Sequence, residues 1–453
     1  MRVQRPSRAV AGAVLATMLT VVAGCGSGSS TRTGAAAAAP SPTSSAAADV
    51  GDPFSGARAA DATMPPLADL LGTGLAKSAG WSGNAASAAA DLRAKLTFLF
   101  TEHTQLLGMV FAAIDTKGPS NSVTKAAQAA LDANSAAVIA EIAEISHPVA
   151  AKKGKATATP TADPNSDTAD LTSGNFATAW KAHNTELVNY AVAAKDKVDS
   201  DTSDAKRNLG VWRQSAASNL KAAAGNKLRS TDVRDGFEKY TNALTDAADS
   251  LAKQDGKGYD ALRTAAGALS DTAGLLADGF AKAGKLSGDS TDDASTGRAR
   301  LTYLLTEHAD LVTDVAYAGY AAAADGGMTG AAANAAKASL DANGKDLSAA
   351  FGNAANAANQ ALFVEDWRRH IIDLVGYATA TQPANSAGQA KYLGELGTYR
   401  TTAASFFASI SGNQVDTTKV AAAFATQFAA LTADIRALAA ALPPSSGSDD
   451  NGS

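Results

Sequence analysis

Two segments of the sequence place a glutamate next to a histidine inside an apolar helical pattern. The segments LTFLFTEHTQLL and LTYLLTEHADLV carry the pairs Glu102-His103 and Glu307-His308. The whole chain of 453 residues contains only five histidines. Imidazole and carboxylate groups can bind metals, transfer protons or form buried hydrogen-bond networks. The chemistry of this repeated pair is therefore the first question that the sequence raises.

Helical phase places further polar residues on the buried stripe of each predicted helix, in steps of three and four. The candidate polar layer consists of Glu102, His103, Asp132, Asn134, His183 and Arg213 in the first half, and Glu307, His308, Asp341, Asn343, His370 and Arg400 in the second. An unpaired buried polar group costs roughly 1–3 kcal/mol. These side chains must therefore satisfy one another or hold a ligand.

Three interpretations of the layer stay open. In the structural one, Arg213 pairs with Glu102 or Asp132 and the histidines bridge the helices. In the second, each half binds a metal or small ligand; the cofactor would be a divalent metal ion, held by His103, His183, His308 and His370. Haem binding or catalysis is the third. Adjacent residues such as Glu102 and His103 lie about 100° apart around a helix, so they cannot both reach one ion.

Motifs of enzymes give little support to catalysis. No Gly-x-Ser-x-Gly elbow, Walker loop, His-Glu-x-x-His helix or dinucleotide fingerprint occurs in a supporting context. There is no Cys-x-x-Cys-His motif for haem attachment. We therefore expect a protein that is not an enzyme.

The elements that carry these residues are predicted to be helices. Alanine is abundant, and strand-like alternation of Val, Ile and Thr is scarce. Hydrophobic residues make up 46% of the chain and charged residues 18%, which suits globular folds with large cores. The formal net charge of -5 argues against a nucleic-acid partner. The predicted fold class is all-α.

Internal repeats divide the chain into two units. Glu307 follows Glu102 by 205 residues (307 − 102), and RTTAAS at Arg400 follows RQSAAS at Arg213 by 187 (400 − 213). This tandem duplication predicts two four-helix bundles, each after a short leading helix, over residues 63–256 and 257–443. Residues 146–174 form a Pro- and Thr-rich insertion, predicted to be a surface loop in which His147 is incidental.

The ends of the chain are predicted to lie outside the bundles. Residues 1–24 have arginines followed by an apolar stretch, as in a signal peptide. Residues 25–62 are small, polar and interrupted by proline, so we expect a disordered tether. Residues 444–453 are expected to be a disordered tail.

The sequence Val22-Ala23-Gly24-Cys25 resembles the lipobox of bacterial lipoproteins. The resemblance implies cleavage before Cys25 and attachment of diacylglycerol and palmitate to this residue, the only cysteine of the chain. The expected location is the extracytoplasmic face of the cell membrane, with the lipid as the membrane partner.

The Glu-His segments, together with the Trp-x-x-His segments at Trp180 and Trp367, are similar to helical repeats of bacterial secreted proteins labelled as copper amine oxidase-like. The similarity covers most of residues 90–220 and 298–410. It implies a His-based site, and no established function comes with it. We expect a non-catalytic binding or structural module; the alternative is a metal- or small-ligand-binding protein with one site per bundle. The sequence does not identify a protein or small-molecule partner.

Overall fold

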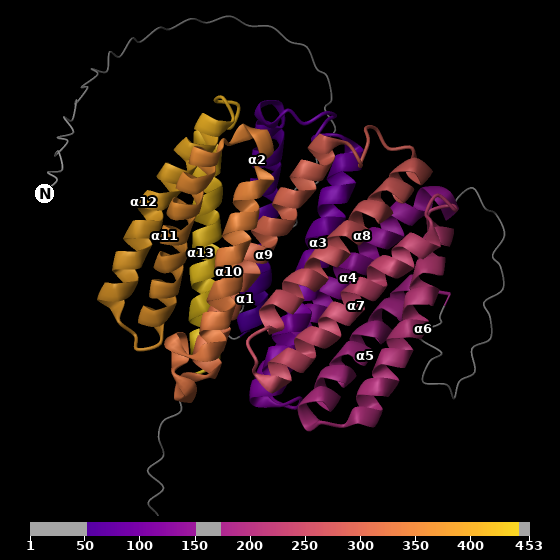
Figure 1. The fold of residues 1–453 in the computed structure, drawn as a ribbon, viewed down its shortest axis with the longest axis horizontal. Helices are drawn as coiled ribbons and strands as arrows, with labels where there is room; N and C mark the ends of the chain where they lie inside the picture. The colour runs from indigo at the N-terminus through magenta and orange to yellow at the C-terminus, as the bar shows by residue number, and fades with distance from the viewer. Residues whose placement is uncertain (1–51, 151–173, 444–453) are drawn as a thin grey trace, which may run out of the picture. The chain divides into compact units, whose positions relative to one another are not determined.

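The computed structural model describes residues 52–150 and 174–443, and every regular element in these ranges is a helix. The all-α prediction is therefore confirmed. The helices of the first part are α1 (Pro53–Asp61), α2 (Met64–Ala79), α3 (Ala88–Lys117), α4 (Ser122–Ala150), α5 (Phe176–Asp196), α6 (Asp199–Ala223) and α7 (Ser230–Lys253). Those of the second are α8 (Gly258–Gly284), α9 (Asp293–Ala321), α10 (Ala331–Ala350), α11 (Ala357–Thr381), α12 (Ser386–Ile410) and α13 (Thr417–Ala441), with short 3₁₀ turns η1 (Ala323–Asp325), η2 (Gly327–Thr329) and η3 (Gly352–Ala354) (Figure 1).

Several predicted features lie outside the described residues. They are the signal peptide, Cys25, the tether up to residue 51, most of the predicted insertion (151–173) and the tail from residue 444. The side chain of His147 is also outside them, although α4 continues to Ala150. Within the ranges that are described, no helix has the length and apolar character needed to cross a bilayer.

The predicted disordered tether was expected to extend to residue 62, but residues Pro53–Asp61 form helix α1, so this part of the prediction is wrong. The Asp52 carboxylate accepts hydrogen bonds from the amides of Phe54 and Ser55, and Pro53 occupies the first helical turn. Both features favour a helix start. Phe54 is fully buried. The helix then stops before Pro65 and Pro66, because proline lacks an amide proton and fits only the first turn of the next helix, α2.

Each half contains one bundle helix more than the four that the sequence analysis predicted. These helices, α7 and α13, bury equivalent residues 187 positions apart: Phe237 and Phe424 (424 − 237), and Leu244 and Leu431 (431 − 244). With the offset of 205, α1 and α2 together correspond to the single helix α8. We call α1–α2 and α8 the leading helices.

The leading helices are exchanged between the two halves. Helix α8 packs mainly on α3 and α7 of the first half, whereas α1 and α2 pack mainly on α9 and α13 of the second. In Figure 1 the indigo α1 and α2 accordingly lie among the orange and yellow helices. Helices α3 and α9 also pack directly against each other.

Contacts between the halves occur in reciprocal pairs. The amide of Ala89 donates to the carbonyl of Ser287 at 3.0 Å, and the amide of Ala294 donates to the carbonyl of Ser82 at 2.9 Å. Ala294 follows Ala89 by 205 residues (294 − 89), and Ser287 follows Ser82 by the same number (287 − 82). Local two-fold symmetry thus relates the two halves where α3 and α9 begin.

One continuous hydrophobic core joins both halves. The described residues also belong to a single compact unit and do not separate at residue 256. The division between residues 256 and 257 remains a prediction about where the duplicated units meet in the sequence. In the structure, the hydrophobic core extends across this division. Neither half, as bounded there, contains all the helices that cover its core.

Candidate functional site

A buried polar chain in the first half connects α1, α3 and α4. Arg58 Nε donates to Glu102 Oε1 at 3.0 Å, and Asn134 Nδ2 donates to Glu102 Oε2 at 2.6 Å. Asn134 Nδ2 also donates to the Leu99 carbonyl at 3.0 Å, and His103 Nδ1 lies 3.0 Å from Asn134 Oδ1. The carboxylate, amide and imidazole groups are buried.

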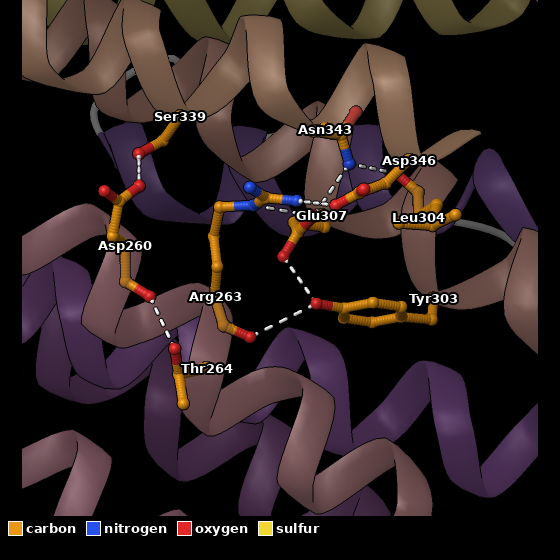
Figure 2. A network of polar contacts seen from close by, with 9 residues as sticks. All are labelled: Asp260, Arg263, Thr264, Tyr303, Leu304, Glu307, Ser339, Asn343 and Asp346. Atoms are coloured by element: carbon orange, nitrogen blue, oxygen red, sulfur yellow. Dashed lines mark hydrogen bonds and ion pairs between the residues drawn. The ribbon is translucent and has the colours of Figure 1, made fainter. Parts of the chain in front are cut away.

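The second half repeats this chain at equivalent positions (Figure 2). Arg263 Nε donates to Glu307 Oε2 at 3.2 Å, and Asn343 Nδ2 donates to the same oxygen at 2.8 Å. Tyr303 OH adds a hydrogen bond to Glu307 Oε1 at 2.7 Å. The guanidinium of Arg263 also reaches Asp346 Oδ2 at 2.6 Å. Three helices, α8, α9 and α10, are thereby joined through Glu307.

The arginines of these chains are not the predicted ones. Arg213 instead contacts α7, with Nη1 at 3.3 Å from Thr241 Oγ1 and 3.7 Å from Glu238 Oε1, and Arg400 is exposed. The partners of the glutamates are Arg58 and Arg263, which stand 205 positions apart (263 − 58) on the leading helices. The repeat itself could have revealed them, because ARAA from residue 57 corresponds to LRTA from residue 262.

The two predicted aspartates also lie outside the buried layer. Asp132 is exposed on α4. Asp341 forms an ion pair with Arg368 on α11, with Oδ2 at 3.0 Å from Nη2, and another with Lys345 at 2.8 Å. Hydrogen bonding to Arg368 lowers the pKa of Asp341 to about 2. Each aspartate stands two residues before a buried asparagine, and a step of two turns a side chain to another face of the helix.

Each half encloses a pair of fully buried histidines among aromatic rings. His103 and His183 have ring centroids 5.5 Å apart, and those of His308 and His370 are 5.0 Å apart. His183 stacks on Trp212 at 4.2 Å, and His370 stacks on Tyr399 at 4.6 Å. These aromatic residues, not the predicted arginines, face the histidines from α6 and α12.

Hydrogen bonding determines the tautomers in the first half. Both amide hydrogens of Asn134 are used, so its Oδ1 is an acceptor and His103 Nδ1 must carry the proton. The Nδ1 of His183 faces the Trp180 carbonyl and is likewise a donor. Both Nε2 atoms therefore carry a lone pair. Among the described residues His103 Nε2 has no hydrogen-bond partner, while His183 Nε2 lies 3.4 Å from Tyr240 OH.

In the second half the two Nε2 atoms face each other, with His308 Nε2 3.0 Å from His370 Nε2. Asn343 and the backbone of Trp367 act on the two imidazoles as Asn134 and Trp180 do in the first half, although these contacts fall outside strict hydrogen-bond geometry.

All four imidazoles are neutral at physiological pH. Burial lowers the pKa of His103 to about 4 and that of His308 to about 3. Burial, reinforced by the neighbouring histidine, lowers the pKa of His183 and His370 well below the usual range. Neutral imidazoles with Nδ1 protonated and Nε2 free have the form in which histidine binds metals.

The predicted divalent ion does not fit this geometry well. A structural zinc ion takes four ligands, whereas the described residues contain no group of three or more His, Cys, Asp or Glu side chains arranged to hold a metal. The two glutamates turn toward arginine and asparagine and leave each pair with two imidazole ligands.

A second polar cluster, absent from the sequence predictions, lies between α1, α9 and α13. It contains four buried carboxyl groups, those of Asp61, Asp310, Asp314 and Asp434. The carboxyl groups of Asp61 and Asp310 interact closely enough that each affects the pKa of the other, which favours a proton on one of them. Thr313 Oγ1 donates to Asp434 Oδ2 at 2.7 Å. The equivalent residues of the other half are Ala266, Gln105, Met109 and Ala247, so a search for repeated residues could not find this cluster.

Burial keeps these carboxyl groups largely protonated. It raises the pKa of Asp314 to about 8 and that of Asp434 to about 7. Burial together with the charge of Glu102 also raises the pKa of Asp61 well above its usual range.

No protein-family model matches the chain, and neither the curated proteins nor the solved structures include a significant match. The site must therefore be interpreted from its own geometry.

Proposed function

We propose that the protein is a non-catalytic binding module, held on the extracytoplasmic face of the membrane by a lipid on Cys25, that encloses one small ligand in each half at its pair of histidines. The observation that carries this proposal is the free Nε2 atom of His103. It is a buried lone pair without a hydrogen-bond partner among the described residues, and it lies at the end of the hydrogen-bonded series Glu102, Asn134 and His103 Nδ1. An unsatisfied buried acceptor costs roughly 1–3 kcal/mol, and a ligand bound to this nitrogen would remove that cost.

Full burial of all four imidazoles supports binding over catalysis. A general acid or base must reach the proton that it transfers in a bound substrate. The histidines are shielded by Trp and Tyr side chains that are themselves buried, and their pKa values lie far below neutral pH. A small ligand held between two rings fits this setting better than a reacting substrate.

Protein purified without a histidine tag tests the proposal. Elemental analysis and native mass spectrometry should find up to two small ligands per chain, and the apoprotein should gain thermal stability when its ligand returns. A folded protein that contains no ligand and gains no stability from metal ions, haem or small anions would leave only a structural role.

The anchor is tested separately through Cys25→Ser. The variant should leave the membrane fraction or remain unprocessed, because two or three acyl chains at about 0.8 kcal/mol per buried methylene supply the attachment. A variant that is processed and membrane-bound like the parent would contradict the lipoprotein assignment.

A further inference from the structure

His308 Nε2 and His370 Nε2 lie only 3.0 Å apart. Two nitrogen lone pairs repel each other at this distance, so a proton or a cation must lie between them. Asn343 uses both amide hydrogens on the Leu304 carbonyl and on Glu307, which leaves an oxygen to face His308 Nδ1. The backbone of Trp367 acts on His370 Nδ1, although outside strict hydrogen-bond geometry. If both Nδ1 atoms carry protons toward these oxygens, as in the first half, two bare Nε2 atoms are opposed.

A simple hydrogen bond between the rings fits less well. If His308 carried its proton on Nε2, its bare Nδ1 would face Asn343 Oδ1, and if His370 did so, its bare Nδ1 would face the backbone of Trp367. In either case two acceptors would be opposed there instead. A second proton, on both nitrogens of one ring, would create a buried imidazolium, which desolvation disfavours strongly. A cation bound to both Nε2 atoms removes the conflict without charging either ring.

The charge of the surroundings favours a monovalent cation. Both ligands are neutral, and Glu307, the carboxylate next to His308 in the sequence, is already paired with Arg263. Because an uncompensated buried charge is costly and a double charge far more so, a divalent ion would need anionic ligands that the site lacks. Two-coordinate geometry is characteristic of monovalent d¹⁰ ions, and imidazole is a suitable ligand for copper.

We propose that each histidine pair binds one monovalent d¹⁰ cation of the copper(I) class, in two-coordinate geometry through both Nε2 atoms. This inference rests on the proposed binding function and names its ligand. With metal–nitrogen bonds of about 2 Å, a linear unit needs about 4 Å between the nitrogens, so His308 and His370 must part by about 1 Å. In the first half the rings already lie farther apart, and the Tyr240 hydroxyl lies beside His183 Nε2.

The buried amide of Gln427 is a candidate third neighbour in the second half. Gln427 occupies the position of Tyr240 (427 − 240 = 187), the residue beside His183, and among the described residues its amide atoms have no hydrogen-bond partner. Its oxygen would add a weak neutral ligand and no charge, which keeps the preference for a monovalent ion.

Silver(I), which does not change oxidation state, is the first probe for the full-length untagged protein with Cys25→Ser, because a free thiol would itself bind silver(I) or copper(I). Titration followed by native mass spectrometry should give two silver ions per chain, and copper(I) under reducing, anaerobic conditions should give the same number. His370→Gln should reduce the stoichiometry to one, and the double variant His183→Gln/His370→Gln to zero. His147→Gln, which changes the histidine outside both pairs, should still bind two. Circular dichroism checks that each variant is folded.

Measurements on the unmodified protein keep the test independent of folding defects in variants. X-ray absorption of the copper(I)-loaded protein should show two nitrogen ligands. Nitrogen NMR of labelled histidine should show large shifts for Nε2 and small ones for Nδ1. If zinc or a small anion binds at two per chain and silver(I) and copper(I) do not, the binding function stands and the monovalent assignment falls. If nothing binds to folded protein, both proposals fail.

Discussion

The four buried carboxyl groups, which include Asp314 and Asp434, should make the folded protein less stable as the pH rises. Their folded-state pKa values are raised, so the folded protein holds protons that the unfolded chain has released above about pH 4. Stability is therefore lost as pH rises through about 7 and about 8. The buried histidines have lowered pKa values, so they make the protein less stable as the pH falls. This effect is confined to pH values below their unfolded pKa of about 6.5. We predict a net fall in unfolding free energy between pH 6.5 and 8.

The variant Asp314→Met tests this prediction, because methionine is the residue at the equivalent position 109. Below its folded-state pKa this carboxyl contributes a slope of about 1.4 kcal/mol per pH unit. Urea denaturation at several pH values should show a flatter dependence for the variant. Asp132→Asn, at an exposed position, is the control and should keep the dependence of the parent. Stability that is constant or rises from pH 6.5 to 8 in the parent would contradict this account.

The buried and exposed ion pairs of the second half should differ in their contribution to stability. Glu307 is fully buried and accepts from Arg263, Tyr303 and Asn343. Glu307→Gln removes the buried charge partner of Arg263 and leaves only the more exposed Asp346. Breaking a buried pair typically costs 3–5 kcal/mol, so we expect a loss of about 3 kcal/mol. Asp341→Asn removes a more exposed pair and should cost about 1 kcal/mol or less. Equal losses in urea denaturation would show that the chain through Glu307 has no special role.

Helical phase located the buried glutamates, asparagines and histidines but not the fourth member of the layer. In α6 the series Leu209, Arg213, Ala216 has steps of four and three, whereas the observed buried series Leu209, Trp212, Ala216 has steps of three and four. Both fit a period of 3.6 residues equally well. Only the position of the neighbouring helices decides between such series, and a single sequence does not contain that information.

At the scale of elements, helix α1 should be as important to stability as a core helix. Phe54 is fully buried, and its ring lies 6.1 Å from that of Tyr317 on α9. Phe54→Ala should therefore cost about 3–5 kcal/mol. Leu362→Ala, at a side chain that is 55% exposed, is the control and should change stability little. If residues up to 61 were only a tether, the two variants would have the same unfolding free energy as the parent.

The sequence predicted α3–α6 and α9–α12 but not α1, α7 or α13. The composition around Pro53 is that of a linker, and its small residues bury little area until they meet another part of the chain. Helix α7 lacks the polar seam residue that drew attention to the others. Extending the repeat comparison would have helped, because AALT at residues 429–432 matches NALT at 242–245.

At the scale of the whole molecule, the exchange of leading helices should hold the halves together after the chain is cut. The connection between α7 and α8 is exposed from Lys253 to Lys257. A protease site inserted there should give two fragments that coelute on size exclusion and melt in one transition, because each half contributes a leading helix to the other. Independent bundles would separate, or would melt separately.

The exchange also determines the order in which the fold can be completed. Helix α1 emerges first during synthesis, yet it packs on α13, whose first residue comes 356 positions after the end of α1 (417 − 61). Contacts so distant in sequence form slowly, since a long loop must close before they contribute. The first half can gather its six helices, α3–α8, while the rest of the chain is still being made. Helix α2 can pack once α9 is made, whereas α1 reaches its main partner only when α13 is complete, so the packing of α1 on α13 is expected to be a late step of folding.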